Sequence, residues 1–183
     1  MKKMYKSGVL VGRFQTVHKG HEMMINTAIG LCETVSVFVG SSNESRTYKN
    51  PFTYEERKEM LKTVFGDGIG VFPLPDIGVG NNPRWGDYVI ENIKKQTSVL
   101  PDLIISGKEA RRSNWFDSGE ADKIGELFVA KTIDISASEM RDFIIENNFD
   151  EWKKYTSSKL WYRFSDMREI ILLSKENKQT NCI

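Results

Sequence analysis

The amino-acid sequence predicts an α/β fold built on a doubly wound parallel sheet of five to six strands, followed by a helical C-terminal cap. Along residues 1–148, short apolar runs rich in β-branched residues alternate with segments of helical periodicity, a pattern typical of a parallel sheet covered on both faces by helices. Residues 149–183 carry aromatic and aliphatic residues without a strand pattern, which indicates helices packed back on the sheet. We expect one domain over residues 1–183, because domains usually contain about 100–200 residues.

Five strands are expected from the apolar runs, all buried within the sheet. They are Val9–Val11, Val35–Val39, Ile69–Phe72, Leu103–Ile105 and Leu127–Val129, of which Ile69–Phe72 is the weakest. The repeated alternation of these strands with helices predicts a Rossmann-like sheet.

Helices are expected at four places between the strands, and more in the tail. They are His21–Leu31, a helix that begins after Thr53, Trp85–Lys95, Ser138–Asn147, and the segment from Phe149 to about Lys175. Thr53 and Glu56 have the spacing of a capping box, in which two side chains satisfy each other's backbone donors at a helix start.

The composition excludes several classes of partner. The 26 basic and 25 acidic residues nearly cancel, whereas binders of nucleic acid or anionic membranes usually have a basic excess, so we expect neither partner. No apolar run reaches the roughly 18 residues that a membrane span requires. The two cysteines, Cys32 and Cys182, form neither a disulfide framework nor a metal motif, so a cytoplasmic protein is expected.

Both histidines of the chain fall in His18-Lys19-Gly20-His21, directly after the first predicted strand and at the opening of a helix. Ligands of open α/β sheets bind at the carboxyl ends of strands, and a helix N-terminus there attracts phosphate. Gly20 lacks a Cβ and would let a nucleotide approach the backbone. Two imidazoles can donate hydrogen bonds to phosphate oxygens as charge builds up, each contributing about 10²–10³-fold. The alternative is half a zinc site, but no further ligands stand at metal spacing.

A second candidate anion site lies at Ile135–Arg141. Ser136 and Glu139 fit a capping box, which by itself predicts only the start of a helix. Ser138 and Arg141 lie one helical turn apart and would add donors that face the first site.

Four loops are weaker candidates. Arg13, in the turn Gly12–Gln15, has a guanidinium that can bind phosphate oxygens in a fork. Gly40-Ser41-Ser42 and Ser106-Gly107-Lys108 follow predicted strands, and Asp76–Trp85 is a long loop that ends in an aromatic residue. Core packing is the alternative role for Trp85. The sequence contains neither a G-x-x-x-x-G-K-[ST] loop nor a G-x-G-x-x-G after the first strand, so we expect neither a P-loop kinase nor a dehydrogenase.

A His-x-Gly-His after the first strand, followed far downstream by Ile-Ser-x-Ser-x-x-Arg, resembles the nucleotidyltransferase superfamily related to class I aminoacyl-tRNA synthetases. From about Val9 to Trp152, the chain is similar to archaeal-type nicotinamide-nucleotide adenylyltransferases. The motifs that carry the resemblance are Gly12–His21, Gly40–Ser42, Asn50–Thr53 with Glu56-Arg57, Asp76-Ile77 with Asn82 and Trp85, and Ser106-Gly107. Lys49 stands where that family has an arginine, which exchanges a bidentate fork for a point charge.

The resemblance implies a transferase of NAD biosynthesis, which joins ATP and nicotinamide mononucleotide to give NAD and pyrophosphate by direct in-line attack on the α-phosphate. Mg²⁺ would be bound to ATP rather than to a protein metal site. The implied catalytic residues are His18, His21 and Arg141, and the implied ATP-binding residues are Gly12, Arg13, Phe14, Gln15, His18, Gly20, His21, Ser106, Gly107, Ser136, Ser138 and Arg141. The implied acceptor-binding residues are Gly40, Ser41, Lys49, Asn82 and Trp85. A homo-oligomer is expected by resemblance alone.

Two alternative functions stay open from the sequence. A sister enzyme would use pantetheine phosphate or glycerol phosphate, although the loop with Asn82 and Trp85 favours a flat aromatic acceptor. A non-catalytic nucleotide sensor would keep the site for binding only, although a pure binder has no need of the pair His18 and His21.

Overall fold

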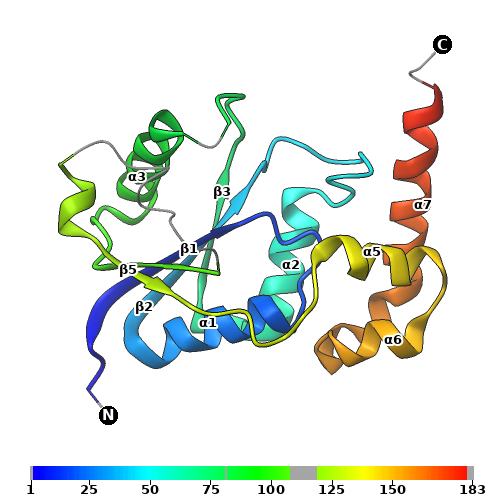
Figure 1. Ribbon diagram of the computed structural model, residues 1–183, viewed down its shortest axis with the longest axis horizontal. Helices are drawn as coiled ribbons and strands as arrows, with labels where there is room; N and C mark the ends of the chain where they lie inside the picture. The colour runs from blue at the N-terminus through cyan, green and yellow to red at the C-terminus, as the bar shows by residue number, and fades with distance from the viewer. Residues whose placement is uncertain (1, 81, 108–118, 181–183) are drawn as a thin grey trace.

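The computed structural model describes residues 2–80, 82–107 and 119–180. Five strands form one parallel sheet in the order β3-β2-β1-β4-β5 (Figure 1). The strands are β1 (Tyr5–Gly12), β2 (Cys32–Gly40), β3 (Gly70–Leu74), β4 (Leu103–Ser106) and β5 (Gly125–Phe128). The doubly wound Rossmann-like prediction is confirmed, and the direction of winding reverses between β1 and β4, the position where such sheets bind ligands.

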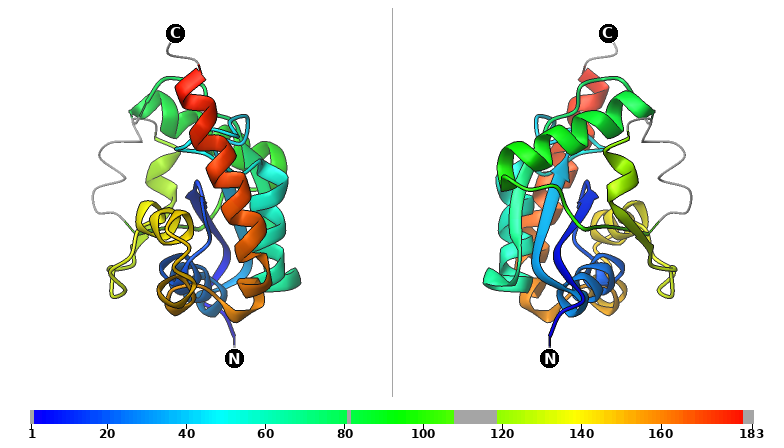
Figure 2. Two further views of the ribbon diagram at one scale, coloured as in Figure 1. Left: turned by 90° about the vertical axis from the view of Figure 1, so that its right-hand side faces the viewer. Right: turned by 90° about the vertical axis from the view of Figure 1, so that its left-hand side faces the viewer.

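Six α-helices accompany the sheet in the described residues, with three short 3₁₀ helices. They are α1 (Lys19–Leu31), α2 (Tyr54–Phe65), α3 (Pro83–Thr97), α5 (Ala137–Ile145), α6 (Phe149–Lys154) and α7 (Phe164–Thr180), and the 3₁₀ turns are η1 (Gly66–Gly68), η2 (Ala121–Lys123) and η3 (Ser158–Arg163). The predicted capping boxes at Thr53 and Ser136 are both present. In the views of Figure 2, α7 ends at the opposite end of the molecule from the start of β1.

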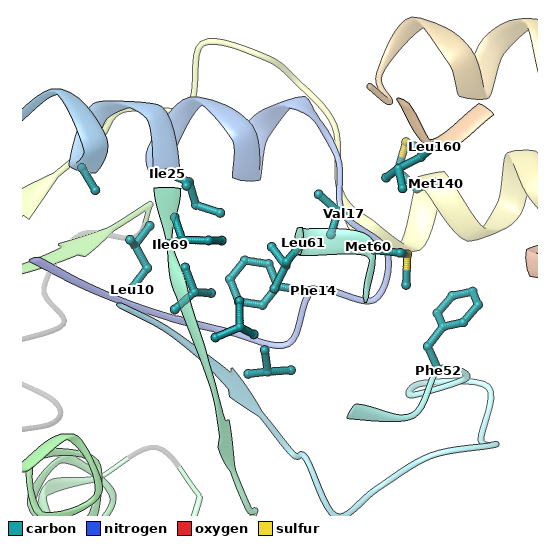
Figure 3. Close-up of a cluster of buried hydrophobic side chains, with 14 of the residues drawn as sticks. Leu10, Phe14, Val17, Ile25, Phe52, Met60, Leu61, Ile69, Met140 and Leu160 are labelled. Atoms are coloured by element: carbon teal, nitrogen blue, oxygen red, sulfur yellow. The ribbon is translucent and has the colours of Figure 1, made fainter. Parts of the chain in front are cut away.

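Two hydrophobic clusters cover the two faces of the central strands. Because successive residues of a strand point to opposite faces, Leu10 and Val37 belong to one cluster, whereas their neighbours Val9 and Phe38 belong to the other. The first cluster also contains buried residues of α1 and α2, including Ile25 and Leu61 (Figure 3). The second cluster is completed by residues of α3. Helices therefore shield the sheet on both sides, as the apolar runs predicted.

The C-terminal helices share the first of these clusters. Trp152 is fully buried, and its ring centroid lies 5.1 Å from that of Phe164. Leu160 and Met167 belong to the same cluster as Leu10 of β1. The backbone N–H of Lys19, the first residue of α1, donates to the carbonyl oxygen of Tyr155 at 2.7 Å. The C-terminal segment therefore fixes the start of α1.

The fifth strand differs from the prediction. It spans Gly125–Phe128 rather than Leu127–Val129, and it is not buried, since Phe128 is 40% exposed. The reason is topological: β5 lies at the edge of the sheet and pairs only with β4. Cys182 lies outside the described residues. Within the described part of the chain, no helix is both long and apolar enough to cross a membrane.

Candidate nucleotide-binding site

A cavity of about 580 Å³ opens at the carboxyl ends of β1, β2 and β4. Its walls include the residues that directly follow these strands, among them Arg13, Ser41 and Gly107. This volume is within the range of about 300–1,000 Å³ that small-molecule sites occupy. The cavity therefore lies at the switch point of the sheet, where the sequence predicted a nucleotide.

The histidine pair forms one wall of this cavity. His18 is the N-cap residue of α1 and is 7% exposed, and its ring centroid lies 3.8 Å from that of His21. On its other side, the His21 ring lies 4.8 Å from the ring of Phe14. Within the described residues, the Nδ1 atoms of both histidines lack a hydrogen-bond partner. Two buried ring nitrogens of the pair are thus left without a partner among the described residues.

Burial favours the neutral form of both imidazoles. It lowers the pKa of His18 from 6.5 to about 4, with a further decrease from the charge of Lys131 and a smaller opposing effect of Glu139. The pKa of His21 is also lowered well below 6.5, first by burial and then by the neighbouring His18. A neutral imidazole donates through one ring nitrogen and accepts through the other. Near pH 7, each ring can therefore donate one hydrogen bond to an anion.

Gly20 is required for the position of His18. A Cβ atom built on Gly20 would lie 3.0 Å from Cε1 and 3.1 Å from Nδ1 of the His18 ring, whereas carbon atoms in contact are normally about 3.5–4.0 Å apart. From the sequence, this glycine was expected to let a nucleotide approach the backbone. The structure adds that the space beside the missing side chain is already occupied by the imidazole.

Two buried arginines hold the loop between β1 and α1 from behind. Arg141 of α5 is 6% exposed, and its Nη1 donates to the carbonyl oxygen of Gln15 at 2.7 Å. Arg57 of α2 is fully buried and donates to the carbonyl oxygen of Arg13 at 2.9 Å. The side chain of Gln15 makes two hydrogen bonds with the backbone of Phe52, at 2.9 and 3.0 Å. The loop that carries the histidines is therefore anchored to α2 and α5.

The candidate acceptor side of the cavity contains an aromatic ring and a fixed carboxylate. Trp85 lines the cavity and lies in the first turn of α3, with its ring 5.5 Å from that of Tyr88. Asn82 is the N-cap of this helix and accepts from the backbone N–H of Trp85. Asp76 also lines the cavity, and its carboxylate accepts from the hydroxyl of Ser41 at 3.1 Å.

Most of the predicted site residues come together at the cavity, and five do not. Those that line it are Gly12, Arg13, Phe14, His18, Gly20, His21, Gly40, Ser41, Lys49, Trp85, Ser106 and Gly107. Gln15, Asn82, Ser136, Ser138 and Arg141 are not among the lining residues. The hydroxyl of Ser136 caps α5, and that of Ser138 accepts from Arg141 at 3.1 Å. Lys108 lies outside the described residues.

One wall of the cavity has no counterpart in the predicted site. Alternate residues of the segment after β5 line it, namely Val129, Lys131, Ile133 and Ile135. Every second residue of an extended chain points to the same side, so this segment turns one face toward the cavity. From the sequence, Val129 was expected in a buried strand, and only Ile133-Asp134-Ile135 alternates between apolar and polar residues, which is too short a signal to identify this wall. This wall adds Lys131 to the basic residues Arg13 and Lys49 at the cavity.

Together, the parallel sheet, the cavity at its switch point and the histidines at a helix start define a nucleotide-binding protein of the α/β class. A model of the cytidylyltransferase-like family matches residues 9–160, and the chain belongs to this family. Among its relatives is the nicotinamide-nucleotide adenylyltransferase of Thermococcus kodakarensis, 31% identical over 159 residues that cover 82% of this chain and 78% of the relative. The enzyme of the same name from Thermococcus onnurineus is 32% identical over 158 residues, with the same coverage of each chain.

Solved structures agree with this fold. A bifunctional NMN adenylyltransferase/ADP ribose pyrophosphatase from Francisella tularensis, complexed with AMP and a manganese ion, matches with a TM-score of 0.74 at 22% identity and covers 96% of this chain. This chain spans about half of that protein, 54%. A putative nicotinate-nucleotide adenylyltransferase from Vibrio parahaemolyticus matches with a TM-score of 0.62 at 14% identity, covering 92% of this chain and 99% of that one.

Proposed function

We propose that this chain is an adenylyltransferase that joins ATP and nicotinamide mononucleotide to give NAD and pyrophosphate. The observation that carries the proposal is the pair His18 and His21, whose rings lie 3.8 Å apart at the start of α1 on the wall of the cavity. The relatedness to archaeal enzymes of this name supports the choice of acceptor and nucleotide.

The proposed reaction is a direct displacement at the α-phosphorus. An oxygen of the acceptor's 5′-phosphate forms the new bond to the α-phosphorus, and the bond from that phosphorus to the bridging oxygen of the β-phosphate breaks. Pyrophosphate leaves with the electron pair. Because the attacking phosphate is already an anion, no general base is needed. The protein has to align the two phosphates and stabilise the charge of the transition state.

His18 and His21 are proposed to stabilise that charge. Both are neutral near pH 7 and each can donate one hydrogen bond to the α-phosphate. The partial positive charge at the start of α1 acts in the same direction. Arg13 and Lys49, at the cavity, are proposed to bind the other phosphate oxygens.

Ser136, Ser138 and Arg141 were expected to contact ATP, and this stays a prediction. The Arg141 guanidinium donates to the carbonyl oxygen of Gln15 and to the hydroxyl of Ser138. We propose that Arg141 acts on catalysis by fixing the loop that ends at His18. A direct contact with ATP need not break these bonds, because the guanidinium has five N–H donors and the two bonds use two of them.

The acceptor is proposed to lie against Trp85, with its pyridine ring on the indole face. Aromatic rings stack favourably in this way. Asn82 would act by fixing the first turn of α3, since it caps that helix rather than lining the cavity. Gly40 and Ser41, at the end of β2, would contact the ribose phosphate of the acceptor.

A divalent cation, proposed to be Mg²⁺, fits this site as a companion of the nucleotide. No group of three or more His, Cys, Asp or Glu side chains that could hold a metal occurs in the described residues. Mg²⁺ commonly keeps its water ligands and binds through substrate phosphates, so the triphosphate would carry it. When bound, it neutralises part of the phosphate charge.

A cytoplasmic location and self-assembly of this chain also stay predictions.

The test is a product assay with competing substrates. The protein is incubated with Mg-ATP and, separately, nicotinamide mononucleotide, pantetheine phosphate or glycerol phosphate, and pyrophosphate and the joined product are quantified. CTP replaces ATP in a parallel series. Pyrophosphate and NAD formed only from ATP and nicotinamide mononucleotide support the proposal. Turnover with another acceptor, or ligand-dependent stabilisation without any turnover, contradicts it.

A further inference from the structure

Arg57 is a buried cation whose hydrogen bonds all go to backbone carbonyl groups. Its Nη1 donates to the carbonyl oxygens of Arg13 at 2.9 Å and Gly40 at 2.8 Å, and its Nη2 to that of Ser41 at 3.1 Å. Its Nε donates to Thr53 at 3.1 Å. No ion pair of the described residues includes Arg57, and its side chain is fully buried. One guanidinium therefore joins the carboxyl ends of β1 and β2 beneath the cavity.

This bonding fixes the direction of two peptide groups. In a trans peptide, the carbonyl oxygen and the N–H of the next residue point in opposite directions within one plane. The carbonyls of Arg13 and Gly40 point at Arg57, so the N–H groups of Phe14 and Ser41 point away from it. Phe14 and Ser41 both line the cavity, whereas Arg57 does not. The two N–H groups are thus directed toward the cavity side.

These two N–H groups also have no acceptor within the described part of the chain. Among the residues that the structure describes, neither Phe14 nor Ser41 donates a backbone hydrogen bond, whereas the next N–H, that of Ser42, donates to Leu74 at 3.1 Å. Both residues adopt the left-handed backbone conformation, with φ of 52° at Phe14 and 48° at Ser41. Non-glycine residues adopt this conformation rarely and mostly where surrounding contacts enforce it.

We propose that Arg57 is a positioning residue that turns the N–H groups of Phe14 and Ser41 into the cavity, where the two together bind one phosphate group of a substrate. Convergent backbone N–H groups form anion-binding sites. Unlike mobile side chains, such donors are already in place before the ligand arrives. The inference deepens the proposed function and requires from it only that the ligand carries phosphate.

An arginine is needed for this arrangement because of its shape. The planar guanidinium presents five N–H donors in a rigid fork, and here the two Nη atoms reach both strand ends. A lysine would keep the charge, but its single nitrogen has three donors on a flexible stem, fewer than the four hydrogen bonds that Arg57 makes. Arg57→Lys should therefore weaken the hold on the two peptide groups and leave the fold in place.

The first experiment follows the backbone amides directly. In ¹H–¹⁵N spectra of the wild-type protein, added inorganic pyrophosphate should shift the amide protons of Phe14 and Ser41 downfield, because they gain charged acceptors. Amide signals of these two residues that stay in place at saturating pyrophosphate would overturn the proposal. This readout needs no variant, so it tests phosphate binding by the two amides even if Arg57→Lys does not fold.

The second experiment measures affinity and turnover. Arg57→Lys should bind pyrophosphate about 10–100-fold more weakly than wild type and lower kcat by a similar factor. Circular dichroism checks the fold. Arg46→Lys is the matched control, because Arg46 also binds a carbonyl near the start of α2, that of Pro51, but lies outside the cavity. Arg46 also forms an exposed ion pair with Glu56, and exposed ion pairs contribute little, so Arg46→Lys should leave both values within about twofold.

The outcomes separate this inference from the proposed function. Equal pyrophosphate affinity of folded Arg57→Lys and wild type contradicts the role of Arg57. A wild-type protein that binds pyrophosphate through these amides but makes no NAD contradicts the proposed function and leaves the inference intact.

Discussion

Replacing Gly20 by alanine should lower turnover without destabilising the protein. The new Cβ would lie 3.0 Å from Cε1 of His18, so the ring has to move by about 0.5 Å or more to reach a normal contact. It cannot move toward His21, because the two ring centroids are already 3.8 Å apart. A displacement approaching 1 Å at a reacting group can cost about 10²-fold. We therefore expect kcat to fall by about 10–100-fold.

Unlike its kcat, the stability of Gly20→Ala should increase. Alanine is favoured over glycine in a helix by up to about 1 kcal/mol, and Gly20 is the second residue of α1. Gly30→Ala is the matched control, since Gly30 lies in the same helix and a Cβ there meets no atom within 4 Å. Steady-state kinetics and thermal melting should separate the two variants. A Gly20→Ala protein with wild-type kcat would refute the steric explanation.

Three further predictions follow from the same site. His21→Ala should lower kcat by about 10²–10³-fold with an unchanged melting temperature, and normal turnover would remove this histidine from the mechanism. Trp85→Ala should raise KM for the acceptor at least about tenfold with little change in KM for ATP, whereas equal increases would place Trp85 outside the acceptor site. Because the pKa of His18 is about 4 when folded and 6.5 when unfolded, protons bind the unfolded state more strongly in this range, and stability should decrease as pH falls. From pH 7 to pH 5 this group should remove about 2 kcal/mol. Urea unfolding should show a smaller loss for His18→Asn, and an equal loss would contradict the shift.

The sequence was sufficient to predict the architecture because local signals agree with it. Apolar runs located all five strands, and the spacing of Thr53 with Glu56 and of Ser136 with Glu139 located two helix starts. The burial of β5 was predicted wrongly, because an apolar run does not reveal whether a strand has one neighbour or two.

The part of the site that the sequence did not reveal depends on long-range contacts. Arg141 and Gln15 are 126 positions apart, and nothing in either segment indicates that one holds the carbonyl of the other. Arg57 was noted only as part of a motif, because its partners are backbone atoms, which every residue possesses. The steric reason for Gly20 likewise depends on the orientation of the His18 ring, which only the structure provides.

The most direct measurement is a crystal structure with a nonhydrolysable ATP analogue and nicotinamide mononucleotide bound together. We expect the α-phosphate at about 3 Å from an imidazole nitrogen of His18 or His21, and the pyridine ring against Trp85. A nucleotide bound outside this cavity, or an α-phosphate beyond the reach of both imidazoles, would contradict the proposed function.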